Sequence, residues 1–233
     1  MTDRLTGTVG WQQAAVVDVR PETSRARTYR LRPEQPLTHR AGQHVVIRLT
    51  APDGYTAQRS YSIASAPDDT GELELTVERL DGGEVSTFLH DEVVVGDALE
   101  VRGPIGGWFV WDGDGPAVLV GGGSGLVPLM AMLRQARDLG RSELVRLTVS
   151  ARTPADLLYA DELPGPEVTV VHSRAPSGIR PAGRLVAADL DVLPDATAYV
   201  CGSSGFADAA SRLLVDLGQP VDKIRVERFG PSG

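Results

Sequence analysis

The sequence predicts two domains, an antiparallel β-barrel over residues 1–112 followed by a doubly wound, parallel-sheet α/β domain over residues 113–233. Three observations support this division. Apolar and polar residues alternate with a period of two up to about Val110, whereas short unbroken apolar runs take turns with helical segments after Pro116. An acidic, glycine-rich stretch at 112–115 separates the two patterns. We expect the domain boundary there, because such residues favour turns and linkers.

Half-buried strands account for the first pattern. Leu73, Leu75 and Val77 alternate with acidic and polar neighbours, and the segment 45–49 has the same period. Only the segment 85–91 is predicted to form a short helix. Turns separate the strands at 52–54, 81–83 and 103–107. A series of short strands divided by such turns is typical of an antiparallel barrel.

Parallel strands buried on both faces account for the second pattern. The apolar runs that predict them are 117–120, 145–149, 168–171 and 198–200. The first helix carries Leu126, Met130, Leu133 and Arg137 and is expected to end at Gly140. The last helix is expected over 206–217, ending at Gly218, because glycine adopts the left-handed conformation that closes a helix.

Composition excludes several classes of protein. The chain has 233 residues and a formal charge of -8, which disfavours binding to nucleic acid or anionic membranes. Cys201 is the one cysteine, so an intrachain disulfide and a cysteine-ligated iron–sulfur cluster are excluded, and we expect no metal site. No apolar run has the length of a membrane span or signal peptide, so we expect a cytoplasmic protein that does not insert into membranes. Nothing in the sequence indicates an oligomeric state.

Two glycine-bearing turns each follow a predicted strand and precede a predicted helix, at 121–128 and 201–206. Glycines let a backbone approach a pyrophosphate, and free N–H groups at a helix start stabilise its charge. Open α/β sheets bind ligands at the carboxyl ends of their strands, so the pair of turns indicates a dinucleotide site. Tight turns without a ligand, with Cys201 as a small buried filler, are the alternative.

The barrel half contains a group of residues suited to a flavin. Alternation places Arg59, Tyr61 and Ile63 on one face and Ser60 and Ser62 on the other. A guanidinium pairs with phosphate, a phenol stacks on a flavin ring, and a hydroxyl donates toward flavin N5. The alternative is an ordinary edge strand with an exposed arginine.

A further turn, at 83–86, introduces the short predicted helix. Its backbone N–H groups and the Ser86 hydroxyl are suited to a second pyrophosphate. Ser86 as a simple helix cap is the alternative.

In this order, the motifs resemble those of the ferredoxin-NADP reductase superfamily from about Trp11 onward. The motifs are Arg59-Ser60-Tyr61-Ser62, Gly83 to Ser86, Gly103-Pro104-Ile105-Gly106, Gly121 to Pro128 and Cys201-Gly202-Ser203. The resemblance implies an FAD-binding barrel followed by a pyridine-nucleotide domain. It implies that Arg59 meets the flavin pyrophosphate, Tyr61 stacks on the ring, Ser62 approaches N5 and Cys201 faces the nicotinamide. The segment 76–79 would lie along the flavin tail.

The expected cofactor-binding residues divide between the two halves of the chain. On the flavin side they are Arg59, Ser60, Tyr61, Ser62, Val77, Arg79, Gly83, Val85 and Ser86. On the nucleotide side they are Gly122, Gly123, Ser124, Gly125, Pro128, Arg152, Ser173, Arg174, Cys201 and Gly202. The arginines at 152 and 174 follow predicted strands and are suited to a 2′-phosphate, which favours NADPH, with NADH possible. Solvated surface arginines are the alternative.

The chain departs from the family pattern at its C-terminus. Plant-type members finish on an aromatic residue that covers the flavin, whereas this chain continues past Phe229 to Gly233. Phe229 is the candidate for that cover, on a tail that moves aside for the nicotinamide, and a buried anchor of the last strand is the alternative. Many bacterial relatives carry a fused ferredoxin, for which this chain has neither room nor cysteines.

The expected function is hydride transfer from NADPH or NADH to bound FAD, with electrons passed to a separate redox protein such as a ferredoxin, an oxygenase component or a molybdoenzyme. Ser62, Cys201 and Glu227 are expected to tune the reacting groups. A free flavin reductase is one alternative, although the 83–86 turn favours a retained flavin. A non-catalytic relay or regulatory subunit is another, although such subunits usually add a cluster. A binding module that has lost the chemistry is a third.

Overall fold

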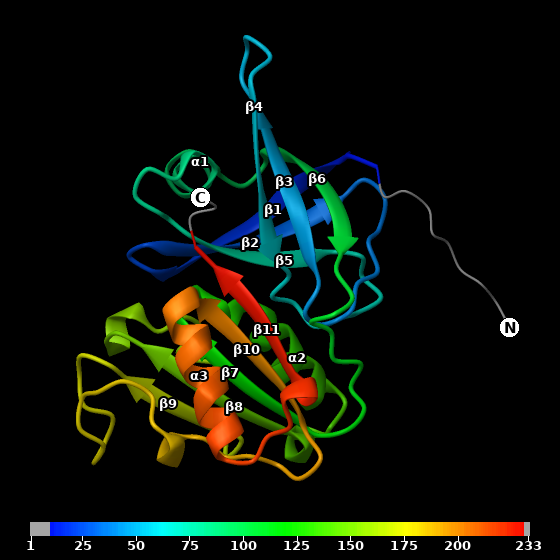
Figure 1. Cartoon of the computed structure of the whole chain (residues 1–233). Coiled ribbons are helices and arrows are strands. Elements are labelled where there is room, and N and C mark those ends of the chain that lie inside the picture. The colour runs from blue at the N-terminus through cyan, green and yellow to red at the C-terminus, as the bar shows by residue number, and fades with distance from the viewer. Residues whose placement is uncertain (1–9, 231–233) are drawn as a thin grey trace, which may run out of the picture.

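The computed structural model describes residues 10–230, which form an upper, mainly antiparallel unit and a lower α/β unit (Figure 1). In the upper unit the strands are β1 (Gln12–Thr23), β2 (Ala26–Pro33), β3 (His44–Thr50), β4 (Thr56–Ser62), β5 (Leu73–Glu78) and β6 (Ala98–Ile105), with helix α1 (Glu84–Asp91) between the last two. Their order is β4-β3-β6-β1-β2-β5, and every pair is antiparallel. An antiparallel bridge between Ile63 and Leu75 brings the two edges together, so the sheet closes as the predicted barrel.

The barrel interior is filled by the residues whose period of two predicted strands. Val45, Ile47, Leu73, Leu75 and Val77 are all at most 1% exposed and belong to one apolar cluster. Each such side chain contributes roughly 1.5–3 kcal/mol by leaving water. The alternation therefore fixes both the strands and the inward face of the sheet.

Burial along β4 does not alternate as its sequence predicts. Arg59 and Ser60 are both exposed, Tyr61 is half-buried, and Ser62 is buried at 6% exposure. Burial rises toward the end of the strand, and Ile63 and Ala64, which follow it, are fully buried. The expected separation into two faces is therefore lost at Ser62.

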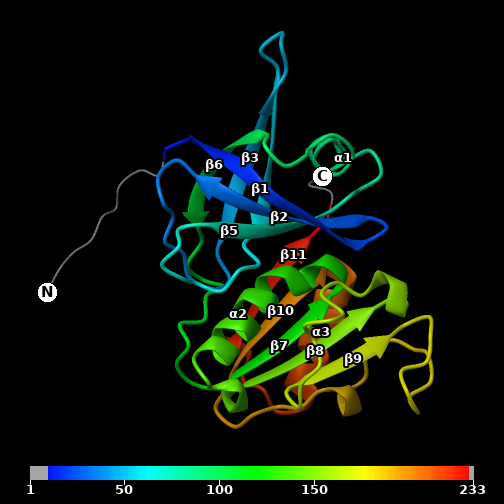
Figure 2. The ribbon, with the colours of Figure 1, turned by 180° about the vertical axis from the view of Figure 1, so that it is seen from behind.

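The lower unit is a parallel sheet with helices on both faces (Figures 1 and 2). Its strands are β7 (Ala117–Gly122), β8 (Val145–Ala151), β9 (Val168–His172), β10 (Thr197–Ser203) and β11 (Ile224–Phe229), in the order β11-β10-β7-β8-β9. Helix α2 (Leu126–Asp138) packs in one apolar cluster and α3 (Ser204–Asp216) in another. Gly140 and Gly218 follow them with φ of 65° and 91°, which confirms the predicted helix ends.

Short 3₁₀ turns complete the lower unit. They are η1 (Gly123–Gly125), η2 (Ser142–Leu144), η3 (Pro154–Asp156), η4 (Ala187–Asp189) and η5 (Val221–Lys223). The β8–β9 and β9–β10 connections contain such turns and no α-helix, so the expected alternation of apolar runs with helices holds only at the first and last connections. Among the described helices, none is long and apolar enough to cross a membrane.

The connection between the two units is buried. Phe109 and Trp111 are 2% exposed and pack in the same cluster as α2 and β8. The Val110 carbonyl accepts hydrogen bonds from the Tyr199 hydroxyl at 2.8 Å and from Arg225 Nη1 at 2.9 Å. The chain thus enters the second unit as part of its core, and Asp112, Asp114 and Gly115 in the stretch that follows are exposed.

Candidate cofactor site

The two glycine turns lie side by side at the carboxyl ends of neighbouring strands. Gly121 at the end of β7 pairs with Cys201 on β10. A Cβ atom placed on Gly125 would lie 2.2 Å from the Cys201 carbonyl oxygen, so only glycine allows this approach of the turn to the strand. The structure therefore brings the two predicted nucleotide motifs together.

The glycines of these turns have two different structural roles. A Cβ atom on Gly122 or Gly202 would meet the Phe206 ring at 2.7 or 2.6 Å, so both glycines make room for that ring. Gly123 has a φ of 57° and open space where its Cβ would be. Close packing thus explains Gly122, Gly125 and Gly202, whereas Gly123 and Gly205 have open space where a Cβ atom would be.

Helices α2 and α3 begin at these turns, and no acidic side chain in their first turns offsets the positive charge of the helix N-terminus. Neither α2 nor α3 has an acidic residue in its first turn. Ser203 caps α3 by accepting a hydrogen bond from the Phe206 N–H at 3.4 Å, and Pro128 is buried inside α2. Ser124 is half-buried in the η1 turn. Both helix starts fit a pyrophosphate anion.

The flavin motif occupies the end of β4. The Arg59 guanidinium donates to the neighbouring Gln58 carbonyl at 2.7 Å and, within residues 10–230, forms no ion pair. An exposed, uncommitted guanidinium of this kind fits a phosphate. Burial raises the pKa of the Tyr61 phenol, which therefore stays neutral and suited to stacking.

The turn before α1 is braced by its own serine. The Ser86 hydroxyl donates to the Gly83 carbonyl and accepts from the Leu80 N–H, each at 3.2 Å. No side chain caps the helix at Gly83, so main-chain N–H groups are the part of this turn that fits a phosphate.

Three other predicted flavin contacts are already engaged in the fold. Val77 and Val85 are each 1% exposed, so their side chains are not available to a ligand. Arg79 pairs with Asp91 at 3.2 Å and with Asp81 at 3.5 Å. A flavin contact by Arg79 would compete with these carboxylates.

The last strand brings three predicted residues to the same place. Glu227 lies opposite Cys201, and Phe229 lies opposite Ser203, in the parallel β10–β11 pair. Burial raises the pKa of Glu227 to about 7. Burial first, and the Glu227 charge second, raise the pKa of the Cys201 thiol. Phe229 packs partly against the α2 cluster, where β11 approaches the barrel (Figures 1 and 2).

The residues expected at a 2′-phosphate also lie at the carboxyl ends of the parallel strands. Arg152 follows β8, and Ser173 and Arg174 follow β9. The Arg174 N–H donates to the Arg152 carbonyl at 2.8 Å, which holds the two segments together. Both arginine side chains are exposed, and neither pairs with a carboxylate of the described chain. The structure thus provides two exposed arginines on adjoining segments at the carboxyl ends of β8 and β9.

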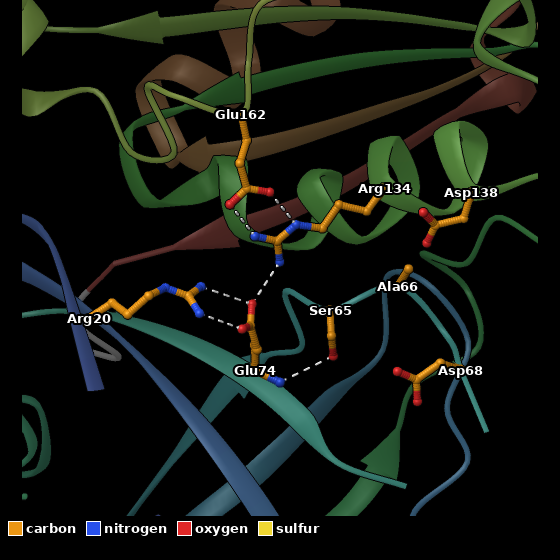
Figure 3. A pocket seen from close by; sticks show the side chains of 8 residues that line it. All are labelled: Arg20, Ser65, Ala66, Asp68, Glu74, Arg134, Asp138 and Glu162. Atoms are coloured by element: carbon orange, nitrogen blue, oxygen red, sulfur yellow. Dashed lines mark hydrogen bonds and ion pairs between the residues drawn. The ribbon is translucent and has the colours of Figure 1, made fainter. Parts of the chain in front are cut away.

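Sequence reasoning missed a polar network on another side of the junction. It surrounds an open cavity of ≈ 430 Å³ lined by Arg20, Ser65, Ala66, Asp68, Glu74, Arg134, Asp138 and Glu162 (Figure 3). These residues come from both units, and none belongs to the predicted site. Their partners are far apart in sequence, as with Arg134 and Ala64, so no local motif could have indicated them.

The fold and the site define a two-domain flavin oxidoreductase. Residues 14–110 match the family described as the oxidoreductase FAD-binding domain, and residues 119–212 match the oxidoreductase NAD-binding domain. The chain belongs to the ferredoxin-NADP reductase superfamily, as its motifs predicted.

Individual relatives are reductases that work with oxygenases. The chain is 31% identical to the reductase component of propane 2-monooxygenase from Rhodococcus jostii (strain RHA1), over 97% of this chain and 66% of that protein. It is 30% identical to the ferredoxin–NAD(P)(+) reductase component of the naphthalene 1,2-dioxygenase/salicylate 5-hydroxylase systems of a Ralstonia species, over 95% and 70%. The chain thus spans about two thirds of the length of these relatives.

A solved structure has the same architecture. The flavohem-like FAD/NAD-binding domain of nitric oxide dioxygenase from Vibrio cholerae O1 biovar El Tor superposes with a TM-score of 0.85 and 25% identity, covering 94% of this chain and 99% of that one. The two-domain arrangement of barrel and parallel sheet is therefore that of known FAD/NAD-binding units.

Proposed function

We propose that this chain oxidises a reduced pyridine nucleotide with the help of bound FAD and passes the electrons to a separate acceptor protein. The observation that carries the proposal is the contact of Gly125 with Cys201, which places two nucleotide-type turns at one edge of the sheet in a chain with FAD-binding and NAD-binding domains. When bound, FAD supplies a ring that accepts a hydride and releases its electrons singly.

We assign the protein's part of this activity to binding, orientation and charge. Arg59 and the main chain at 83–86 would hold the flavin phosphates, and Ser60, Tyr61 and Ser62 would orient its ring. The turns around Gly123 and Gly202, with Ser124, would hold the nucleotide pyrophosphate. Cys201, Glu227 and Phe229 would shape the space beside the nicotinamide.

The acceptor is proposed from the relatives. Two of them are reductase components of oxygenase systems, which supports an oxygenase component or its ferredoxin as the acceptor. Free flavin reduction remains the second candidate, because the Ser86 hydroxyl, expected to help retain the flavin phosphates, is bonded within its own turn. A tightly retained flavin would exclude that candidate.

Nucleotide preference, location and domain boundary are proposed on separate grounds. The free Arg152 and Arg174 side chains support NADPH over NADH. The relatives' roles as reductase components support a cytoplasmic location. The boundary is proposed at residues 112–113, between the segments 14–110 and 119–212 that match the two family models.

The deciding experiment is an anaerobic titration of the flavin-loaded protein with NADPH and, separately, NADH. We expect the visible flavin band to bleach at a lower concentration of NADPH. A protein that neither copurifies with flavin nor rebinds it contradicts the flavin assignment. A flavin that binds but is bleached by neither nucleotide contradicts the reductase activity and favours a relay or regulatory role.

A further inference from the structure

Arg134 on α2 joins the two domains through a single guanidinium. Its Nε and Nη2 atoms donate to the two Glu162 carboxylate oxygens at 2.9 and 2.6 Å, within the nucleotide-binding domain. Its Nη1 atom donates across the junction to the Ala64 carbonyl at 2.9 Å and to Glu74 at 3.0 Å. Figure 3 shows this side chain between the two carboxylates, with Arg20 on the far side of Glu74.

The barrel end of this contact is itself tightly held. The Ala64 N–H donates to the Glu74 carbonyl at 2.7 Å, and the Glu74 N–H donates to the Ser65 hydroxyl at 3.1 Å. Burial alone would raise the pKa of the Glu74 carboxyl, but hydrogen bonds and charges from Arg20 and Arg134 outweigh it and lower that pKa. Glu74 is therefore a stable anion between two cations, two residues from the segment 76–79 that is expected to lie along the flavin tail.

Tyr159 makes a second contact across the same junction. Its hydroxyl donates to the Thr76 hydroxyl on β5, and its N–H donates to Glu22 at 3.0 Å. The ring is 3% exposed and lies beneath the Arg134 guanidinium, 5.2 Å from its central carbon. Tyr159 has a φ of 53°, an unfavourable conformation for a side chain of this size, which these contacts hold in place.

We propose that Arg134 and Tyr159 form a latch that fixes the placement of the nucleotide-binding domain against the flavin-binding strands, with Arg134 as a positioning residue for hydride transfer. Arg134 bonds to the Ala64 carbonyl, two residues beyond Ser62, and Tyr159 bonds to the Thr76 hydroxyl, next to Val77. On the other side, α2 rises directly from the glycine turn, and nine residues of helix place Arg134 about 14 Å from Gly125. Helix α2 thus connects the nucleotide turn to Ala64, just after the predicted flavin motif at the end of β4.

The role of Arg134 as a positioning residue for hydride transfer rests on the proposed function, whereas the latch itself can be tested without activity. Arg134→Lys keeps a positive charge for the two carboxylates but loses the planar fork that reaches Ala64 at the same time. Arg137→Lys is the matched control, because Arg137 lies on the same helix and, among residues 10–230, its side chain bonds to Glu167 and the 162–164 carbonyls of its own domain and to nothing in the barrel.

The first readout is hydrogen exchange of the flavin-loaded protein without nucleotide. In Arg134→Lys we expect faster exchange at residues 62–65 and 74–76 than in Arg137→Lys. Equal protection in the two variants overturns the latch. Should Arg134→Lys fail to fold, Tyr159→Phe, which removes one hydroxyl, tests the same junction by the same comparison.

The second readout is the anaerobic rate of flavin bleaching against nucleotide concentration. Misplacement by about 1 Å can cost on the order of 100-fold in rate, so we expect the limiting rate to fall about tenfold or more in Arg134→Lys, with the apparent Kd for nucleotide little changed. An unchanged limiting rate, or an effect on Kd alone, overturns the positioning role. If nucleotide does not bleach the wild-type flavin at all, the reductase proposal fails, and the exchange comparison alone decides the latch.

Discussion

Glu227 and Cys201 lie directly opposite each other on the parallel strands β11 and β10, so a half-buried carboxyl group neighbours a fully buried thiol. Burial raises the pKa of Glu227 to about 7, and burial together with the Glu227 charge raises that of Cys201. Both groups are therefore mostly protonated in mildly acidic solution, and the carboxyl changes state near neutrality.

The Glu227 pKa gives a pH dependence of stability. Because its pKa in the folded protein, about 7, lies above the ordinary glutamate value of 4.5, its contribution to stability is fully present below about pH 4.5 and is lost as the pH rises through about 7. We expect Glu227→Gln to be more stable than the wild type at pH 8 by about 1–2 kcal/mol, less than the full shift implies because part of the carboxyl stays hydrated. Urea denaturation at pH 5 and pH 8 measures this, and an equal difference at both values would contradict it.

Gly125→Ala should separate the two glycine turns. The new Cβ would lie 2.2 Å from the Cys201 carbonyl oxygen, so α2 or β10 must move, at a cost of about 1–3 kcal/mol in the free energy of unfolding. Gly205→Ala is the control, since that glycine lies in α3 with no atom within 4 Å of its Cβ position, and alanine there should be neutral or stabilising. Similar denaturation midpoints for the two variants would disprove the packing role of Gly125.

Arg59→Ala should weaken flavin binding. Loss of a charge-assisted bond to phosphate typically removes about 1.5–3 kcal/mol, equivalent to roughly 10- to 100-fold in Kd. Flavin Kd is measured by fluorescence titration of the apoprotein. Arg32→Ala, which removes an exposed barrel arginine paired with Glu72 at 2.7 Å, is the control. A flavin Kd within twofold of wild type in Arg59→Ala would argue against the assignment.

Arg174→Ala should change nucleotide preference. If its free guanidinium meets the 2′-phosphate, KM for NADPH should rise about tenfold or more, while KM for NADH, which lacks that phosphate, should stay within about twofold. Arg212→Ala, on α3 and distant in sequence from this edge, serves as control. Equal changes for both nucleotides would show that Arg174 does not discriminate between them.

Much of the fold followed from periodicity alone. The runs at 117–120 and 145–149 are parallel strands, and the alternation at 73–77 is a barrel strand, because burial on both faces or on one face imposes these patterns directly. The helix ends at Gly140 and Gly218 followed from the conformation that glycine adopts there.

The remainder depended on contacts between distant parts of the chain. Ser62 is 6% exposed although alternation along β4 placed it on the face opposite Tyr61, and such burial at a strand end is not revealed by the strand's own sequence. Ser86 bonds within its own turn, although its sequence context equally suited a phosphate. Arg134 bonds to Ala64, which lies 70 residues earlier in the sequence, so this contact between the domains is visible only in the folded structure.

The burial of Phe109 and Trp111 in the α2 cluster has a consequence for how such proteins recombine. The end of the barrel segment supplies side chains that fill the interior of the α/β half. A breakpoint in the glycine-rich stretch at 112–115 would exchange the sheet but leave these aromatic residues behind, against a core that had not evolved with them. Exchange between relatives should therefore preserve folding best when both halves are inherited as one piece.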